Sequence, residues 1–403
     1  MKRKALDGAM EDSSDRDANG KQQQKRARRD FDFSRQPRRK IAIRFLYHGW
    51  LYDGLVQQAN TDNTVEKHLL DALVKTRLVE DRERCEFTRC GRTDRGVSAF
   101  KQVAAFVVRS GTADDSAWWP EESTEVTKQS FKNKEDLPYL RMLNGVLPSS
   151  IRVTAWTTVP RNFTARHACS SRTYKYALPR ASYNLEKLRA ACLLLKGKQD
   201  FRNFCQIDMN EARVSMSYVR EIFDIRIDPV ERPSSPSSSG FLLLELTVRG
   251  SGFLWHMIRF IVGVLHEIGV GNEEPELISR LLNVDATPRR PVYSMATDGP
   301  LCLFDCEFDE ETVKWQTAEK LVAEKNLSAL QKEWAQAATR ARMLENMISA
   351  MSEESPEMDA EKGLLEYVVG HGKQTTYIPF VKRPTCESLE EKRKKLEGKV
   401  VIE

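Results

Sequence analysis

The feature that most constrains the fold of this chain is a pattern of short apolar strands and amphipathic helices that occurs twice in succession. The first run begins with an apolar strand at 41–47, and the second ends with another at 301–308. The spacing of apolar residues, near two in strands and near 3.6 in helices, gives each element one buried face. Two successive α+β segments of this kind predict a sheet covered by helices on one face.

The boundaries of the elements follow from the same periodicities and from capping and turn residues. Thr64 is expected to cap a helix, because its hydroxyl can accept a hydrogen bond from the first turn. In chain order, we expect strands at 41–47, 87–90, 102–108, 151–158, 172–178, 222–227, 241–248 and 301–308, and helices from 64, at 185–195, 253–268, 275–282, 313–350 and 387–399. A polar, acidic stretch at 112–138 is expected to be an insertion loop.

These elements divide the chain into four expected parts. They are a disordered basic tail at 1–37, an N-terminal half at 38–180, a C-terminal half at 181–310 and a helical C-terminal extension with an acidic linker at 311–403. The tail is polar and rich in Gln and Arg, and it is almost free of branched aliphatic residues, so it is not expected to bury a core of its own.

The positive charge of the chain is concentrated at its N-terminus. The net charge is +5, but residues 1–40 hold 13 Lys or Arg against 7 Asp or Glu. A nearly neutral body binds nucleic acid only if its cations gather on one face. The basic clusters at 2–4, 25–29 and 38–40 favour a nuclear signal, although a solvated tail would explain any one of them. We therefore expect the protein in the nucleus and the cytoplasm.

Membrane and secreted classes are not supported by the sequence. The apolar run at 260–265 ends at Arg259 on one side and at His266 on the other, so it is too short to span a membrane, and we expect no membrane partner. Lys2, Arg3 and Lys4 are not followed by the apolar segment of a secretory leader. The 8 cysteines are scattered and are expected to be reduced thiols.

The stretch with the strongest chemical content surrounds Asp94. Asp94 lies in a glycine-bounded loop between Arg92 and Arg95, and a strand is expected on either side. Two neighbouring guanidinium groups favour the charged form of a carboxylate. Gly91 and Gly96 allow a tight bend or a close approach to a ligand. From these residues alone, a structural Asp that caps a turn is the simpler interpretation.

The sequence around Asp94 resembles the active-site motif of the TruA family of pseudouridine synthases, Gly-Arg-Thr-Asp-x-Gly-Val-x-Ala. Further motifs of that family occur in the same order over roughly 41–308. They are Tyr47-x-Gly49 with Tyr52-x-Gly54-x-x-Gln57, Thr64-Val65-Glu66, Leu143-Asn144, Phe163-x-Ala165-Arg166, Arg172-x-Tyr174-x-Tyr176, Gly197-x-x-Asp200-Phe201 and Phe253-Leu254-x-His256-Met257-x-Arg259. Arg89-Cys90, Phe100 and Pro291-x-Tyr293 resemble the eukaryotic branch that acts at tRNA positions 38 and 39.

The resemblance implies a fold and a reaction. The fold is α+β, with two ferredoxin-like halves that form a mainly antiparallel sheet flanked by helices and an active-site cleft between them. The reaction converts uridine into pseudouridine in the anticodon stem-loop of tRNA and needs no cofactor, because nothing is oxidised and no group is lost. Two alternatives remain: a TruA-type synthase for other tRNA or mRNA uridines, and a non-catalytic tRNA-binding protein on the same fold.

The resemblance also implies roles for particular residues. Asp94 is the expected nucleophile, and its attack on C6, its attack on C1′ and its removal of a ribose proton all stay open. Arg92 is expected to fill the gap left by the flipped nucleotide, and Tyr174 to stack on the target base, although Tyr174 could also be a core aromatic. Arg259 is expected to form a buried ion pair with Asp94. The residues expected to contact RNA are Arg95, Arg166, Arg172 and His256; a packing role for His256 is equally open.

The remaining expectations concern metals and partners. Cys85-x4-Cys90 and Cys302-x3-Cys306 lack the short spacing of zinc ligands, so no metal site is expected. Cys302 and Cys306 should share one face of a strand as core thiols. The partner implied by the resemblance is tRNA, bound by a homodimer.

Overall fold

The computed structural model describes residues 31–121, 123–124, 127–128, 131, 135–208, 210, 214–230, 241–359, 361–370 and 377–400. Residues 1–30 of the expected disordered tail lie outside the described residues, and Phe33–Arg35 near its end form a short 3-10 helix. Phe33–Glu403 forms one compact unit.

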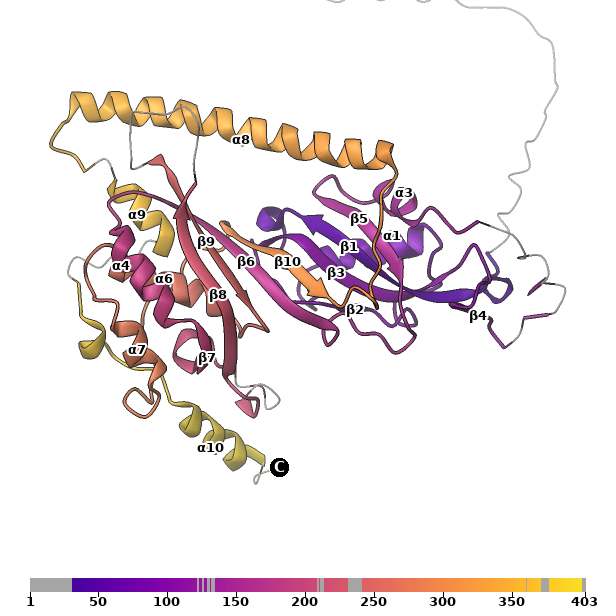
Figure 1. Ribbon diagram of the computed structural model, residues 1–403, viewed down its shortest axis with the longest axis horizontal. Helices are drawn as coiled ribbons and strands as arrows, with labels where there is room; N and C mark the ends of the chain where they lie inside the picture. The colour runs from indigo at the N-terminus through magenta and orange to yellow at the C-terminus, as the bar shows by residue number, and fades with distance from the viewer. Residues whose placement is uncertain are drawn as a thin grey trace, which may run out of the picture. The chain divides into compact units, whose positions relative to one another are not determined.

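A single sheet organises this unit (Figure 1), and its strand order is β11-β5-β1-β3-β10-β6-β9-β8-β7. All of the described pairings are antiparallel except the short parallel pairing of β3 with β10. The prediction of a mainly antiparallel sheet flanked by helices is therefore confirmed. The strands are β1 (Arg38–Tyr47), β2 (Thr88–Arg89), β3 (Ser98–Arg109), β4 (Ala117–Trp118), β5 (Ile151–Thr158), β6 (Cys169–Pro179), β7 (Gly197–Asp200), β8 (Val219–Pro229), β9 (Leu243–Gly250), β10 (Leu301–Phe308) and β11 (Gln316–Thr317).

Helices pack against this sheet and against one another. The α-helices are α1 (Val65–Lys75), α3 (Tyr139–Asn144), α4 (Leu185–Leu194), α6 (Met257–Gly269), α7 (Leu277–Leu282), α8 (Lys320–Glu354), α9 (Lys362–Val369) and α10 (Leu389–Val400). Helix α4 packs on β8 and α6, α9 packs on β6, and α3 packs on β5. The short 3-10 helices are η1 (Phe33–Arg35), η2 (Gly49–Leu51), η3 (Arg202–Phe204) and η5 (Phe380–Lys382).

Local sequence explains several of these elements. Thr64 caps α1 as expected, because its side chain accepts a hydrogen bond from the Lys67 amide. Strand β5 alternates strictly between buried and partly exposed positions. Strands β1 and β3 lie inside the sheet and are buried along most of their length, which is why their sequences read as nearly continuous apolar runs.

The largest differences from the expected boundaries are at the starts of two helices, and β3 also begins earlier than expected, at Ser98. The helix expected at 253–268 begins only at Met257, because His256 adopts a left-handed backbone conformation with φ 62°. The helix expected at 313–350 begins at Lys320, since β11 uses Gln316 and Thr317 to pair with β5. The short helices α3 and α9 and the short strands β4, β7 and β11 were not expected. Strand β4 pairs with β1 from within the stretch at 112–138 that was expected to be an insertion loop.

The expected arrangement of Cys302 and Cys306 is also wrong. An irregularity between Leu303 and Asp305 breaks the alternation of β10, so that Leu301, Leu303 and Cys306 are the buried positions. Cys302 therefore lies on the other, partly exposed face of the strand. Bulges commonly re-aim a side chain in this way.

Among the described residues, no helix is both long enough and apolar enough to span a membrane.

Candidate active site

Asp94 lies in the segment 91–97 between β2 and β3, which we call the catalytic loop. The fully buried side chain of Gln102 holds the start of this loop. Its Nε2 donates to the carbonyl of Gly91 and its Oε1 accepts from the Gly91 amide, both at 3.2 Å. The amide side chain thus satisfies both backbone groups of a residue that leaves the strand ladder.

The end of β1 and the segment that follows it, 49–55, hold the middle of the catalytic loop. The Tyr47 hydroxyl lies 2.6 Å from the Thr93 hydroxyl, and the Leu55 amide donates to the Thr93 carbonyl at 3.1 Å. Gly54 has a φ of +106°, and a Cβ on it would lie 3.1–3.3 Å from backbone atoms of residues 93–95. Glycine is therefore required at position 54 both for its backbone conformation and for this close approach.

The Asp94 carboxylate faces the turn that precedes α6. The Trp255 Nε1 donates to Asp94 Oδ1 at 3.2 Å, and His256 Nε2 lies 3.4 Å from Asp94 Oδ2. The left-handed conformation of His256 places these two consecutive side chains beside the same carboxylate. Such a conformation is strained for a non-glycine residue and is often found at functional sites. The Asp94 side chain is 31% exposed, so it remains accessible to a substrate.

His256 is uncharged at neutral pH. Burial lowers the pKa of its imidazole from 6.5, and the positive charge of Arg259 lowers it further, while Asp94 acts in the opposite direction. The neutral ring can orient the carboxylate without neutralising it, as an imidazolium would.

The expected ion pair between Arg259 and Asp94 is not formed among the residues that the structure describes. Arg259 Nε donates to the Ala296 carbonyl at 2.7 Å, and Nη2 lies 3.9 Å from Asp298 Oδ2. The late start of α6 explains the difference, because the turn before the helix reaches Asp94 and the first helical turn faces 296–298. Arg259 still lies close enough to His256 for its positive charge to lower the pKa of the imidazole.

Tyr174 lies in the middle of β6, between β9 and β10. It pairs with Leu303 and Val248, and its ring packs edge-on against Phe253 at 5.1 Å. Burial raises the pKa of its phenol far above the usual value. The group therefore stays protonated, and it can act only as a neutral hydrogen-bonding or stacking group. Tyr176 is a core residue whose hydroxyl bonds to Thr297.

The arginines expected to contact RNA have different environments. Arg92, Arg95 and Arg166 are exposed, and Arg95 Nε lies 3.5 Å from Asp53. Arg172, in contrast, is directed into the protein. Its guanidinium donates to the carbonyls of Ser251, Cys90 and Arg166, at 2.8–3.1 Å.

A cluster of three cysteines lies at the base of the catalytic loop. Cys90, Cys169 and Cys306 are all buried, and their sulfur atoms lie within 4.8 Å of one another. Hydrogen bonds from the thiols of Cys306 and Cys90, together with the charge of Arg172, lower the pKa of Cys169 to about 4. The sequence did not indicate this cluster, because its members come from three distant segments.

The site therefore combines a carboxylate, held by an indole and a neutral imidazole, with exposed arginines on the same loop. A carboxylate of this kind can act as a nucleophile or as a base. Trp255 and Gln102 were missed by sequence reasoning, although Trp255 occupies the variable position beside His256 in the quoted helix motif.

Comparisons with known proteins agree with this geometry. Residues 191–309 match a family model described as tRNA pseudouridine synthase. A protein named probable tRNA pseudouridine synthase tag-124, from Caenorhabditis elegans, is 50% identical over 387 residues, which cover 95% of each chain. The human protein named tRNA pseudouridine(38/39) synthase is 37% identical over 388 residues, covering 91% of this chain and 78% of that protein. The Saccharomyces cerevisiae protein of the same name is 40% identical over 297 residues, covering 72% and 62%.

Proposed function

This chain belongs to the TruA family of tRNA pseudouridine synthases, which isomerise uridine in tRNA, and on that premise we propose that it acts on uridines 38 and 39 of the anticodon stem-loop with Asp94 as its nucleophile. The positions come from the names of the human and yeast relatives. The observation that carries the assignment of Asp94 is the position of its carboxylate, which is partly exposed and is oriented by Trp255 and His256.

The proposed reaction begins with extrusion of the target nucleotide from the RNA stack. Extrusion costs a few kcal/mol, which a side chain that occupies the vacated position offsets. Arg92 is exposed two residues before Asp94, and a guanidinium can both stack on bases and bind phosphate. The flipped base then reaches Asp94. Tyr174 contributes its ring face and a phenol that keeps its proton.

The bound uridine must next break its N1–C1′ bond and form a C5–C1′ bond, and C5 loses a proton while N1 gains one. Asp94 forms a temporary covalent bond to the base or the ribose, or removes a ribose proton, and the base rotates before it is rejoined. Neutral His256 and the Trp255 indole hold the carboxylate in place by contacts that leave its charge available.

The test of this function uses the purified full chain and an unmodified tRNA transcript with uridine at 38 and 39. Position-resolved detection of pseudouridine should show modification at these two positions, and a transcript with cytidine at both should show none. Pseudouridine at other positions only would contradict the proposed specificity and leave the family assignment intact.

We also propose that the sheet is assembled from two ferredoxin-like halves with the active-site cleft between them. The parallel contact of β3 with β10 supports this proposal, because it joins the strands 98–109 and 301–308 in a sheet whose other pairings are antiparallel. The catalytic loop precedes β3, and the turn that contacts Asp94 precedes α6.

A homodimer formed through α8 is a further part of the proposal. Asn326 is the one buried residue of this 35-residue helix (Figure 1). Apolar residues recur along it at alternating intervals of three and four, which is the spacing of a coiled-coil seam. They are Leu327, Leu330, Trp334, Ala337, Ala341, Leu344, Ile348 and Met351. A second copy of the same helix offers the matching stripe, since a twofold interface is self-complementary.

Leu344→Glu should convert such a dimer into a monomer, because it places a carboxylate in the apolar seam. Sedimentation or light scattering would measure the mass. Asn346→Glu is the matched control, because it adds the same charge two residues away and off the seam. A wild-type monomer, or equal masses for both variants, would contradict dimerisation through α8.

Activity and stability should both fall in acid through protonation of His256. Since burial lowers its pKa in the folded state, the unfolded chain takes up the proton first, at about pH 6.5. Stability is therefore lost as the pH falls from about 6.5 through the lowered pKa. In the same window, the imidazolium would engage the Asp94 charge and reduce kcat/KM.

His256→Gln keeps a hydrogen-bonding side chain but removes this titration. Its acid limb of kcat/KM should move to lower pH, and its Tm should depend less on pH than that of the wild type. Identical pH profiles for kcat/KM and Tm in the two proteins would show that His256 does not control the acid limb.

A further inference from the structure

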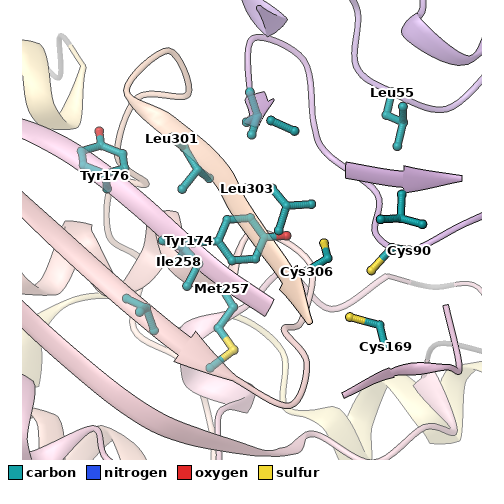
Figure 2. Packing of buried hydrophobic residues seen from close by; sticks show 14 of the residues in the cluster. Leu55, Cys90, Cys169, Tyr174, Tyr176, Met257, Ile258, Leu301, Leu303 and Cys306 are labelled. Atoms are coloured by element: carbon teal, nitrogen blue, oxygen red, sulfur yellow. The ribbon is translucent and has the colours of Figure 1, made fainter. Parts of the chain in front are cut away.

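The sulfur atoms of Cys90, Cys169 and Cys306 lie close to one another, as Figure 2 shows. Cys90 follows β2, Cys169 opens β6 and Cys306 lies in β10. In tetrahedral zinc sites the Zn–S distance is about 2.3 Å, which separates the sulfurs by about 3.8 Å. Sulfurs that already lie within 4.8 Å of one another therefore need only a small movement to ligate one ion.

The charge around the cluster favours a divalent ion. Arg172 lies beside all three cysteines, and its Nη2 donates to the Cys90 carbonyl at 3.1 Å. Three thiolates and one guanidinium carry a net charge of −2, which one divalent cation neutralises. Buried charges are tolerated when they are compensated in this way. Soft thiolate ligands select zinc over the hard cations that prefer oxygen.

We propose that Cys90, Cys169 and Cys306 bind a zinc ion, with water in the fourth position. Thiols that ligate zinc give up their protons, so binding of the ion releases protons to solvent. The ion would join the base of the catalytic loop to β6, which carries Tyr174, and to β10. Its role is positional, because it would fix the residues on either side of the substrate without touching the reacting atoms.

Metal content and cobalt substitution test the proposal directly. The full chain, purified without chelators from zinc-supplemented cells, should contain about one zinc ion per chain by elemental analysis. After zinc removal, cobalt(II) alone should give the near-ultraviolet charge-transfer band of thiolate coordination, and added zinc should abolish that band. Cys169→Ala should lose the band and bind zinc more than about tenfold more weakly.

Cys192→Ala is the matched control, because it truncates another buried thiol outside the cluster. It should keep both the zinc and the cobalt band. Wild-type protein that holds no stoichiometric metal, and gives no thiolate band with cobalt, would overturn the proposal whether or not Cys169→Ala folds. A disulfide between two of the three cysteines in freshly purified protein would overturn it as well. None of these readouts depends on pseudouridine formation, so they remain informative even if the proposed activity fails.

Discussion

Asp94→Asn is expected to abolish pseudouridine formation while tRNA affinity stays nearly unchanged. The amide oxygen can still accept the hydrogen bond from Trp255 Nε1, so the catalytic loop should keep its place. The nucleophilic charge is lost, and kcat should fall by at least about 10³-fold. Affinity should persist because it depends on phosphate contacts with cations, not on this carboxylate. Single-turnover modification and filter binding measure the two quantities separately.

Asp71→Asn is the control for this experiment. Asp71 is an α1 carboxylate of comparable exposure whose partners are Lys67, at 2.7 Å, and Arg82. Removing the Asp71 charge should cost little stability, because each exposed ion pair contributes only about 0–1 kcal/mol. Appreciable turnover by purified Asp94→Asn protein, or equal losses in the two variants, would remove Asp94 from the nucleophile's role.

The fold could be predicted from the sequence wherever periodicity and capping agree. The boundaries of β5 and β10 and the Thr64 cap of α1 lie where the pattern places them. The start of α6 could not be predicted in the same way, because Phe253 and Leu254 continue the apolar pattern of the helix. The backbone leaves the helical conformation at His256 for a tertiary reason, which is the contact of this turn with Asp94.

The site was predictable only in part. The motif around Asp94 identified the loop, but the partners of Asp94 are more than 160 residues away in sequence, and no spacing rule reaches that far. Arg172 was expected to contact RNA, yet it bonds to backbone carbonyls that no sequence pattern indicates. The thiols of Cys90, Cys169 and Cys306 meet only because β2, β6 and β10 end or bulge near one another.

Gly54→Ala should reduce kcat by about tenfold to a hundredfold, because it displaces the catalytic loop. The new Cβ would lie 3.1 Å from the Thr93 carbonyl oxygen and 3.3 Å from backbone atoms of Asp94 and Arg95. These are backbone atoms, which cannot turn aside as a flexible side chain can. The loop must therefore move by a few tenths of an ångström, and the Asp94 carboxylate moves with it.

The same substitution also strains the backbone, and this effect has to be separated from the displacement. Gly197→Ala is the matched variant, because Gly197 has a φ of +100° against +106° at Gly54, while a Cβ there meets no atom within 4 Å. Both variants should lose about 1–3 kcal/mol of stability from the unfavourable φ, measured by denaturant unfolding. Only Gly54→Ala should lose turnover at saturating tRNA, measured at a temperature where both proteins remain folded. If the two variants keep the same kcat, contact between residue 54 and the catalytic loop does not set the position of Asp94. A loss of kcat in Gly54→Ala alone would show that residue 54 must lack a side chain for the segment 49–55 to hold Asp94 in its catalytic position.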